Sequence, residues 1–261
     1  MPTFEALLFD VDGTLADTER DGHRPAFNAA FAEAGLDWVW DPELYGELLA
    51  VTGGKERIRY FLERWLPDWR GPADLSGFIA ELHRSKTRHF VDLLKDGRIP
   101  LRPGVLRLLR ECRAAGVRLA VATTTTPENV TALLETCPEP GLIDWFEVIA
   151  AGDVVPNKKP APDIYTWALD RLGATAGNCI AFEDSDNGVR SAHGAGLGAI
   201  VVTESAYTAG QNFSGACVVL DHLGEPDRPV RLLSGQALGL DYVDLAGLDR
   251  ILAACRGTVS S

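Results

Sequence analysis

Two aspartates, Asp10 and Asp12, stand two positions apart directly after an apolar run that ends at Phe9. Carboxylates at the end of a buried segment cost free energy unless a cation or hydrogen-bond donors compensate for the lost water. Paired carboxylates offer the oxygen ligands that a hard cation such as Mg²⁺ prefers. Gly13 would let the backbone turn away from the run. The segment is therefore a candidate centre for metal-dependent chemistry.

Two aspartates this close together can also arise without such chemistry, in an exposed acidic turn or by chance. A calcium-binding EF-hand loop begins in the same way, but it needs glycine at its sixth position and glutamate at its twelfth. This chain has Leu15 and Asp21 at those positions. An apolar run, not a helix, comes before the segment, so a calcium loop is disfavoured.

Polar residues follow three further apolar runs. Thr123 and the threonines after it precede Pro127, where a helix is expected to begin. Hydroxyl and N–H groups at such a helix start suit a phosphate. Lys159 stands in a proline-rich loop, from which it could project at a fixed point. Glu183 and Asp184 form a second pair of acids after the fourth run.

Each of these segments could also have a purely structural role. Thr126 would cap a helix, a loop lysine is commonly solvated, and acids are favoured at a helix start by the helix dipole. All four segments nevertheless stand at the ends of consecutive predicted strands, which chance rarely produces. We therefore expect them to form one site.

Short apolar runs alternate with stretches of helical periodicity over most of the chain. Runs in which nearly every residue is apolar are typical of strands covered by helices on both faces. This pattern predicts an α/β fold with a doubly wound parallel sheet, in which ligands bind at the carboxyl ends of the strands. The expected strands are 4–9, 117–122, 148–151, 179–182, 199–202 and 217–220, and the expected helices are 103–115, 127–136, 162–172, 186–193 and 245–255.

Residues 17–95 break this alternation, because they show helical periodicity and no convincing strand. Four of the six tryptophans fall in this stretch. We therefore expect two domains: a discontinuous, Rossmann-like catalytic core of residues 1–16 and 96–261, and a helical domain of residues 17–95 inserted after the first strand.

The four polar segments, in this order, resemble those of the haloacid dehalogenase (HAD) superfamily of phosphotransferases. The resemblance implies that Asp10 is the nucleophile that forms an aspartyl-phosphate, and that Asp12 is the general acid and then the general base. Thr123 and Lys159 would hold the transferring phosphoryl oxygens, and the inserted domain would be a C1-type cap. Mg²⁺ would be positioned by Asp10, the backbone carbonyl of Asp12, Glu183 and Asp184.

The physical chemistry agrees with these roles. A carboxylate that approaches a phosphate dianion meets a repulsion of about 4 kcal/mol per charge pair at ~4 Å and an effective dielectric constant of ~20. Mg²⁺ and Lys159 would offset that repulsion. The general acid must carry its proton when the alcohol leaves, so we expect the neighbours of Asp12 to raise its pKa.

The inserted domain contains cations that are candidates for binding a second anionic group. In the expected helix 77–95, Lys86 lies within an apolar stripe, where it either extends to solvent, which we favour, or faces a ligand anion. His83 lies at the edge of that stripe, and His23 could equally be a structural histidine. The loop 52–57 is either an anion site or a simple helix start. The candidate cations are Lys55, Arg57, His83, Arg84 and Lys86.

Segments 17–24, 53–57, 82–87 and 152–156 resemble the CbbY subgroup of this superfamily. That subgroup removes the 1-phosphate of xylulose-1,5-bisphosphate, a Rubisco inhibitor, which associates it with the Calvin cycle. The resemblance implies that the core cleaves the 1-phosphate while cap cations bind the 5-phosphate. It implies substrate contacts from Glu19, His23, Gly53, Gly54, Lys55, Glu56, Arg57, His83, Arg84, Ser85, Lys86, Thr123, Thr124, Thr125, Asn129 and Lys159.

Other functions on the same fold stay open, namely a β-phosphoglucomutase, a phosphoglycolate phosphatase and a general sugar-phosphate phosphatase. A non-catalytic phosphate-binding module is disfavoured, because the nucleophile, the acid, the lysine and the metal-binding acids are all present. The resemblance does not cover residues 221–261 well.

Composition narrows the range of partners. Lys and Arg total 25 against 37 Asp and Glu, a formal net charge of −12, and no basic run is present. We therefore expect a small phosphorylated sugar as partner, and no nucleic acid or membrane. No run approaches the ~20 apolar residues of a membrane span, and the first residues do not resemble a secretory signal. We expect a cytoplasmic protein, and by resemblance a monomer. Five widely spaced cysteines predict buried thiols, with neither a disulfide framework nor a zinc site.

Overall fold

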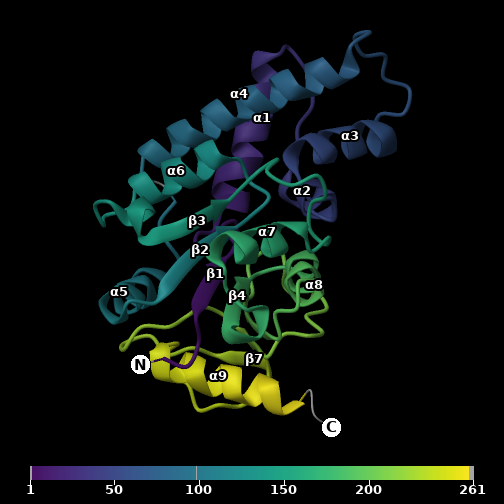
Figure 1. Cartoon of the computed structure of the whole chain (residues 1–261). Helices are drawn as coiled ribbons and strands as arrows, with labels where there is room; N and C mark the ends of the chain where they lie inside the picture. Colours follow the sequence, from purple (N-terminus) through teal and green to yellow (C-terminus); the bar gives the residue numbers. More distant parts are fainter. Residues whose placement is uncertain (1, 98, 259–261) are drawn as a thin grey trace.

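The computed structural model describes residues 2–97 and 99–258. Its centre is a seven-stranded sheet in the order β3-β2-β1-β4-β5-β6-β7 (Figure 1). The first six strands are parallel, and β7 pairs with β6 in the antiparallel direction. This confirms the predicted α/β fold with a parallel sheet. The strands are β1 (Ala6–Phe9), β2 (Arg118–Ala122), β3 (Phe146–Ala150), β4 (Cys179–Glu183), β5 (Ala199–Thr203), β6 (Val218–Leu220) and β7 (Leu232–Gly235).

Alternate strand residues point to opposite faces of the sheet, and helices cover both faces. On one face, Phe9 and Phe182 belong to an apolar cluster that includes residues of α5, α6 and α9. On the other face, Leu8 and Ala181 belong to a second cluster with residues of α7 and α8. Burial of both faces is the reason that these strands are continuous apolar runs. The helices are α5 (Val105–Ala115), α6 (Pro127–Glu135), α7 (Asp163–Leu172), α8 (Asp186–Gly194) and α9 (Leu245–Thr258).

Strand β7 was not predicted from the sequence. Its residues Leu232–Gly235 lie at the edge of the sheet and are exposed or half-buried. A strand in this position needs no continuous apolar run, so the pattern that marked the other six strands is missing.

Residues 17–95 consist of helices joined by loops and contain no strand, as predicted. They begin with a π-helical turn (Glu19–His23) and continue with α1 (Arg24–Glu33), α2 (Pro42–Leu48), α3 (Gly54–Trp65) and α4 (Leu75–Lys95). Figure 1 shows these helices above one end of the sheet. An aromatic cluster that includes Trp38 and Trp40 forms their core. The C-terminal part of α4 contributes to the core cluster of the sheet instead. The domain boundaries at 17 and 95 stay a prediction.

The two chain segments that join the inserted helices to the sheet run side by side. Ala16 forms an antiparallel bridge with Leu101, and the backbone N–H of Arg102 donates to the carbonyl of Leu15 over 2.8 Å. The inserted helices are therefore attached to the sheet by two neighbouring linkers, the first after β1 and the second before α5.

One prediction about cysteines is wrong. The structure pairs Cys217 with Cys255 in a disulfide, with Cα atoms 6.2 Å apart, whereas Cys112, Cys137 and Cys179 are free. The two paired residues are 38 positions apart. They meet because Cys217, next to β6, and Cys255 of α9 belong to the same apolar cluster, which spacing alone does not reveal. Within the described ranges, every helix is too short or too polar to cross a membrane.

Candidate active site

The four predicted polar segments meet at the carboxyl ends of the central strands. Phe9 pairs with Val121 on one side and with Phe182 on the other. The residues that follow these three strands therefore lie beside one another at the same edge of the sheet. They surround a pocket of about 370 Å³. The core contributes Asp10, Asp12, Thr123, Thr124, Lys159, Asp184, Ser185, Asp186, Asn187, Ser205, Tyr207, Thr208, Gln211 and Asn212, and the inserted helices contribute Glu19, Leu49, Ala50, Thr52 and Arg57.

Lys159 links two carboxylates at the base of this pocket. Its Nζ lies 2.7 Å from Asp10 Oδ1 and 2.6 Å from Glu183 Oε1, and the Tyr165 hydroxyl also donates to Glu183 over 2.6 Å. Burial alone would lower the pKa of Lys159, but the two carboxylates hold that pKa above its ordinary value. The lysine is therefore a fixed positive charge beside the proposed nucleophile.

Three acids lie close enough to share one metal ion. Ligand oxygens of Asp10, Glu183 and Asp184 all lie within 4.8 Å of one another. Burial, and then the neighbouring carboxylates, raises the pKa of Asp10 to about 7, although Lys159 opposes the shift. Burial followed by repulsion from Asp10 and Glu183 also raises the pKa of Asp184 well above its ordinary value. Three carboxylates with a single lysine between them leave an oxygen donor set of net negative charge, which fits a hard divalent cation such as Mg²⁺.

The carboxylate of Asp12 belongs to a different group of residues. Thr18 Oγ1 donates to Asp12 Oδ1 over 2.5 Å, and His23 Nε2 lies 2.8 Å from the same oxygen. Burial raises the pKa of Asp12, but the charge and hydrogen bond of His23 and the Thr18 hydroxyl outweigh burial, so the pKa lies below its ordinary value. The expectation of a raised pKa is wrong in this conformation, because the neighbours of Asp12 are donors.

Lys86 completes this group from the middle of α4. Its Nζ lies 2.8 Å from His23 Nδ1 and 5.0–5.2 Å from the centres of the Phe27 and Phe90 rings. The residue is only 4% exposed, so the favoured interpretation that Lys86 extends to solvent is wrong. It does not line the pocket either. A chain of contacts instead joins Lys86 through His23 to Asp12.

Arg57 is the predicted cap cation that faces the pocket. It comes from the first turn of α3 and lines the pocket together with Glu19. Its Nη1 donates to the Tyr45 hydroxyl over 2.9 Å and lies 3.8 Å from Glu19 Oε2, while Tyr45 donates to Glu19. Its Nε is buried and has no hydrogen-bond partner among the described residues. This guanidinium is therefore held in place at the wall of the pocket.

Other predicted cap residues lie around a neighbouring pocket. Gly53, Gly54, Lys55, Glu56 and His83 line it together with Thr124 of the core. Lys55 Nζ lies 2.5 Å from Asp153 Oδ2, an ion pair between α3 and the loop after β3. Burial, and then the charge of Lys86, lowers the pKa of His83 to about 3, so His83 is not a cation at neutral pH.

Two predicted substrate contacts point elsewhere. Arg84 pairs with Glu81 on the exposed side of α4, and Ser85 donates to Glu33 of α1. Neither residue lines the pocket around Asp10. Residues 83–86 lie within helix α4. Successive side chains of a helix point in different directions, so these four cannot all reach one ligand.

The threonine segment after β2 both caps a helix and reaches the pocket. Thr126 caps α6 by accepting from the backbone N–H of Asn129. Thr123 and Thr124 line the pocket. Thr125 and Asn129 lie behind them, where Asn129 Nδ2 donates to Thr125 Oγ1 over 2.9 Å. Capping and a phosphate site are therefore compatible here.

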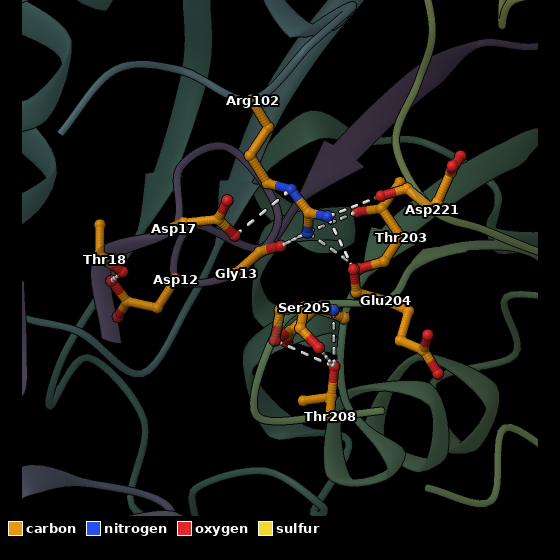
Figure 2. A network of polar contacts seen from close by, with 11 residues as sticks. Asp12, Gly13, Asp17, Thr18, Arg102, Thr203, Glu204, Ser205, Thr208 and Asp221 are labelled. Carbon is orange, nitrogen blue, oxygen red and sulfur yellow. Dashed lines mark hydrogen bonds and ion pairs between the residues drawn. The ribbon is translucent and has the colours of Figure 1, made fainter. Parts of the chain in front are cut away.

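The loop after β5 contributes site residues that were not predicted from the sequence. Ser205 Oγ donates to Asp184 Oδ2 over 2.8 Å, and the backbone N–H of Ser205 donates to Thr208 Oγ1 over 2.8 Å. Both residues and Tyr207 line the pocket, and Figure 2 shows Ser205 and Thr208 together. The available signal was their position directly after an apolar strand, but the segment has no motif to mark it.

Comparisons with known proteins agree over most of the chain. A family model described as haloacid dehalogenase-like hydrolase matches residues 4–196. Protein CbbY of Cereibacter sphaeroides is 52% identical over 221 residues, which are 85% of this chain and 93% of the relative. The plasmid CbbY protein of Cupriavidus necator is 48% identical over 87% of this chain and 88% of the relative.

Solved structures give the same result. The crystal structure of CbbY from Rhodobacter sphaeroides in complex with phosphate is 51% identical, has a TM-score of 0.77, and covers 84% of this chain and 94% of that one. A mutant of that protein in complex with xylulose-(1,5)bisphosphate matches equally well. A further sequence relative, the phosphorylated carbohydrates phosphatase of Thermotoga maritima, is 31% identical over 74% of this chain and 82% of the relative.

Proposed function

Because the chain belongs to the haloacid dehalogenase-like hydrolase family, we propose that its pocket removes the 1-phosphate of xylulose-1,5-bisphosphate and releases xylulose 5-phosphate. At a coarser level, the chain is a sugar-phosphate phosphatase of the CbbY subgroup. One observation carries the finer proposal: Asp10 and Asp12 face the same pocket as Arg57, which reaches it from the inserted helices.

The nucleophile in this proposal is Asp10. One of its carboxylate oxygens attacks phosphorus, the bond from phosphorus to the sugar oxygen breaks, and an aspartyl-phosphate forms. Lys159, 2.7 Å from Asp10, offsets the negative charge that gathers on the phosphoryl group. Thr123 lies at the pocket wall, where its hydroxyl and N–H groups suit phosphoryl oxygens. Water then attacks phosphorus, and Asp10 is released.

Asp12 is assigned to proton transfer. It delivers a proton to the sugar oxygen that leaves and later takes one from the attacking water. In the conformation described here its pKa is lowered by His23 and Thr18, so it is ready to act as a base. His23 Nε2, 2.8 Å away, is placed to pass its proton to this carboxylate before the alcohol leaves. Lys86 Nζ, 2.8 Å from His23 Nδ1, passes a proton to the imidazole in the same step, so His23 stays neutral.

The metal assignment rests on the three clustered acids. Asp10, Glu183 and Asp184 would hold Mg²⁺, and we keep the backbone carbonyl of Asp12 as a further ligand. A bound divalent cation supplies positive charge that reduces repulsion between the phosphate and the carboxylates. Glu183 is fully buried and accepts from Lys159 and Tyr165, so it also fixes the lysine.

The substrate assignment rests on Arg57. A guanidinium pairs well with phosphate oxygens, and this one lines the same pocket as Asp10 and has an unpartnered Nε within the described part of the chain. We assign it to the 5-phosphate, and we propose that residues 17–95 act as a cap that closes over the sugar. Lys55, His83 and Arg84 are left out of this assignment, because they do not line the pocket.

The proposal is tested by phosphate release with Mg²⁺ from xylulose-1,5-bisphosphate and from ribulose-1,5-bisphosphate. The two sugars differ at one stereocentre, so a kcat/KM preference of ~10²-fold for the xylulose compound, about 2.7 kcal/mol, is expected from a dedicated site. Asp10→Asn serves as the control and should release no phosphate above background.

Similar slow rates on both bisphosphates, on β-glucose-1-phosphate and on phosphoglycolate would mean a general sugar-phosphate phosphatase instead. Arg57→Gln separates the two halves of the assignment. It should raise KM for the bisphosphate by roughly tenfold or more and leave KM for a monophosphate substrate unchanged.

A further inference from the structure

Arg102 makes contacts that the proposed chemistry does not use. It lies in the second linker, between α4 and α5, and is 8% exposed. Its guanidinium donates to four backbone carbonyls, and Figure 2 shows them converging on it from separate segments. Nη1 donates to Gly13 and, over 3.0 Å, to Thr203, whereas Nη2 donates to Glu204 over 2.7 Å and to Asp221 over 2.8 Å.

Two of these carbonyls belong to residues that directly adjoin pocket residues in the chain. Gly13 follows Asp12 in the loop after β1. Glu204 precedes Ser205, whose hydroxyl donates to Asp184. Arg102 therefore ties the loop of one candidate metal-binding segment to the loop that orients the carboxylate of another.

The distance between these two loops is tightly constrained. A Cβ atom on Gly13, which has φ +83°, would overlap the carboxylate of Asp184. The glycine backbone thus lies directly against a candidate metal ligand. A small shift of either loop would move Asp184 relative to Asp10 and Asp12.

Arg102 also connects the site with the linkers. Its Nε lies 3.5 Å from Asp17 Oδ1 in the first linker. Asp17 stands beside Thr18, whose hydroxyl donates to Asp12. One side chain thereby joins both linkers to both loops.

A purely structural arginine would look different, and the chain offers one for comparison. Arg107 of α5 also donates to three backbone carbonyls, those of Leu223, Gly224 and Val243. It pairs with Glu111 and Glu225 as well. None of these described partners lines the pocket. The carbonyl residues of Arg102 do not line the pocket either, but Gly13 and Glu204 directly adjoin the lining residues Asp12 and Ser205. The described partners of Arg107 adjoin no lining residue.

We propose that Arg102 is a positioning residue that fixes the loop after β1 against the loop after β5 and so sets the affinity of the site for its divalent cation. The inference rests on the proposed function, because it takes Asp10 and Asp184 as metal ligands. A planar fork of five N–H donors suits this task, since it reaches several acceptors at fixed angles. A lysine ammonium is a compact point charge without that geometry.

The test measures metal binding without substrate, so it does not depend on turnover. Mn²⁺ is titrated into metal-free wild-type protein, Arg102→Met and Arg107→Met, and the free ion is followed by electron paramagnetic resonance. Loss of groups that orient metal ligands costs roughly 10- to 100-fold in affinity. Arg102→Met should therefore raise Kd for Mn²⁺ by that factor, while Arg107→Met stays within about twofold.

Thermal unfolding supplies the comparison that separates positioning from stability. Each variant leaves buried carbonyls without donors, so both should lower Tm. Only Arg102→Met should change Kd. If Arg102→Met does not fold, Arg102→Lys is titrated in its place, and it should also bind Mn²⁺ more weakly than wild type because one ammonium cannot span both loops.

The outcomes are distinguishable. A folded Arg102 variant with the Kd of wild type overturns the inference and leaves the proposed function intact. An equal rise in Kd for Arg107→Met also overturns it, because the effect would then follow stability. A wild-type protein that binds no Mn²⁺ overturns both the inference and the metal assignment.

Discussion

Two buried lysines, one from the core and one from the inserted helices, lie near the reacting carboxylates, and they differ in what they contact. Lys159, from the core, lies within 2.7 Å of two carboxylates. Lys86, from α4, contacts the imidazole of His23 and lies near two aromatic rings. Both are only 4–5% exposed. Their surroundings therefore differ in charge and hardly at all in burial.

The difference appears in their pKa values. Burial lowers the pKa of either lysine, but Asp10 and Glu183 outweigh burial at Lys159 and hold its pKa above the ordinary value. At Lys86, burial dominates, and the more distant Asp12 and Glu19 only reduce the shift, so its pKa falls to about 8. One lysine is thus a permanent charge for the phosphoryl group, and the other can exchange a proton near neutral pH.

The largest expected effect follows from removing Lys159. Lys159→Met takes the counter-charge from Asp10 and Glu183, so we expect kcat/KM to fall on the order of 10³-fold or more and the free energy of unfolding to fall by about 3 kcal/mol. Phosphate release and urea denaturation measure the two effects. Lys158→Met is the matched control, since Lys158 pairs with the exposed Asp153. A Lys159→Met variant within tenfold of wild-type activity would contradict the assignment.

Removal of Lys86 should have a smaller and different effect. Lys86→Met leaves His23 without its Nδ1 partner, so proton transfer through Asp12 should slow and kcat should fall by roughly 10- to 100-fold. KM for the bisphosphate should stay nearly unchanged, because Lys86 does not line the pocket. Steady-state kinetics separate the two parameters. A higher KM with an unchanged kcat would show that Lys86 binds the substrate phosphate after all.

The lowered pKa of Lys86 also predicts how stability depends on pH. Its pKa is about 8 in the folded protein against an ordinary value of 10.5, so between these pH values the unfolded chain binds more protons than the folded one. Stability must then rise with pH in this window, by at most about 1.4 kcal/mol per pH unit. The difference in unfolding free energy between wild type and Lys86→Met, measured in urea from pH 8 to pH 10, isolates this contribution. The unfolding free energy of wild type minus that of Lys86→Met must increase with pH; a value that stays constant or decreases would be incompatible with the assigned pKa.

The smallest effect is expected at Arg84, two positions before Lys86 on the same helix. Its side chain is 67% exposed and pairs with Glu81. Arg84→Ala should leave kcat/KM for the bisphosphate within about twofold, because exposed ion pairs contribute little. The same phosphate-release assay decides. A large loss of activity would restore Arg84 to the substrate site and weaken the distinction between buried and exposed cations of α4.

Much of the fold could be predicted because both faces of the sheet are buried. That burial makes most of the parallel strands nearly continuous apolar runs, although the edge strand β3 contains the exposed Glu147. All six parallel strands agree with the predicted strands to within two residues at every end. The pairing of Cys217 with Cys255 and the edge strand β7 escaped prediction. Both depend on which segments meet in space, and neither carries a local periodicity.

The core half of the site could be predicted from residue types and their order along the chain. Asp10, Thr123, Lys159 and Asp184 follow strands or adjoining loops, and parallel strands bring whatever follows them to one edge. The cap half depends on tertiary packing. The sequence offered several candidate cations in the cap without deciding which of them meets the substrate. In the structure Arg57 faces the pocket, Lys86 contacts His23, and Lys55 and His83 line a neighbouring pocket. Successive side chains of a helix point about 100° apart. Which cation faces the pocket therefore depends on how α3 and α4 are rotated when they pack, and the sequence alone does not determine that rotation.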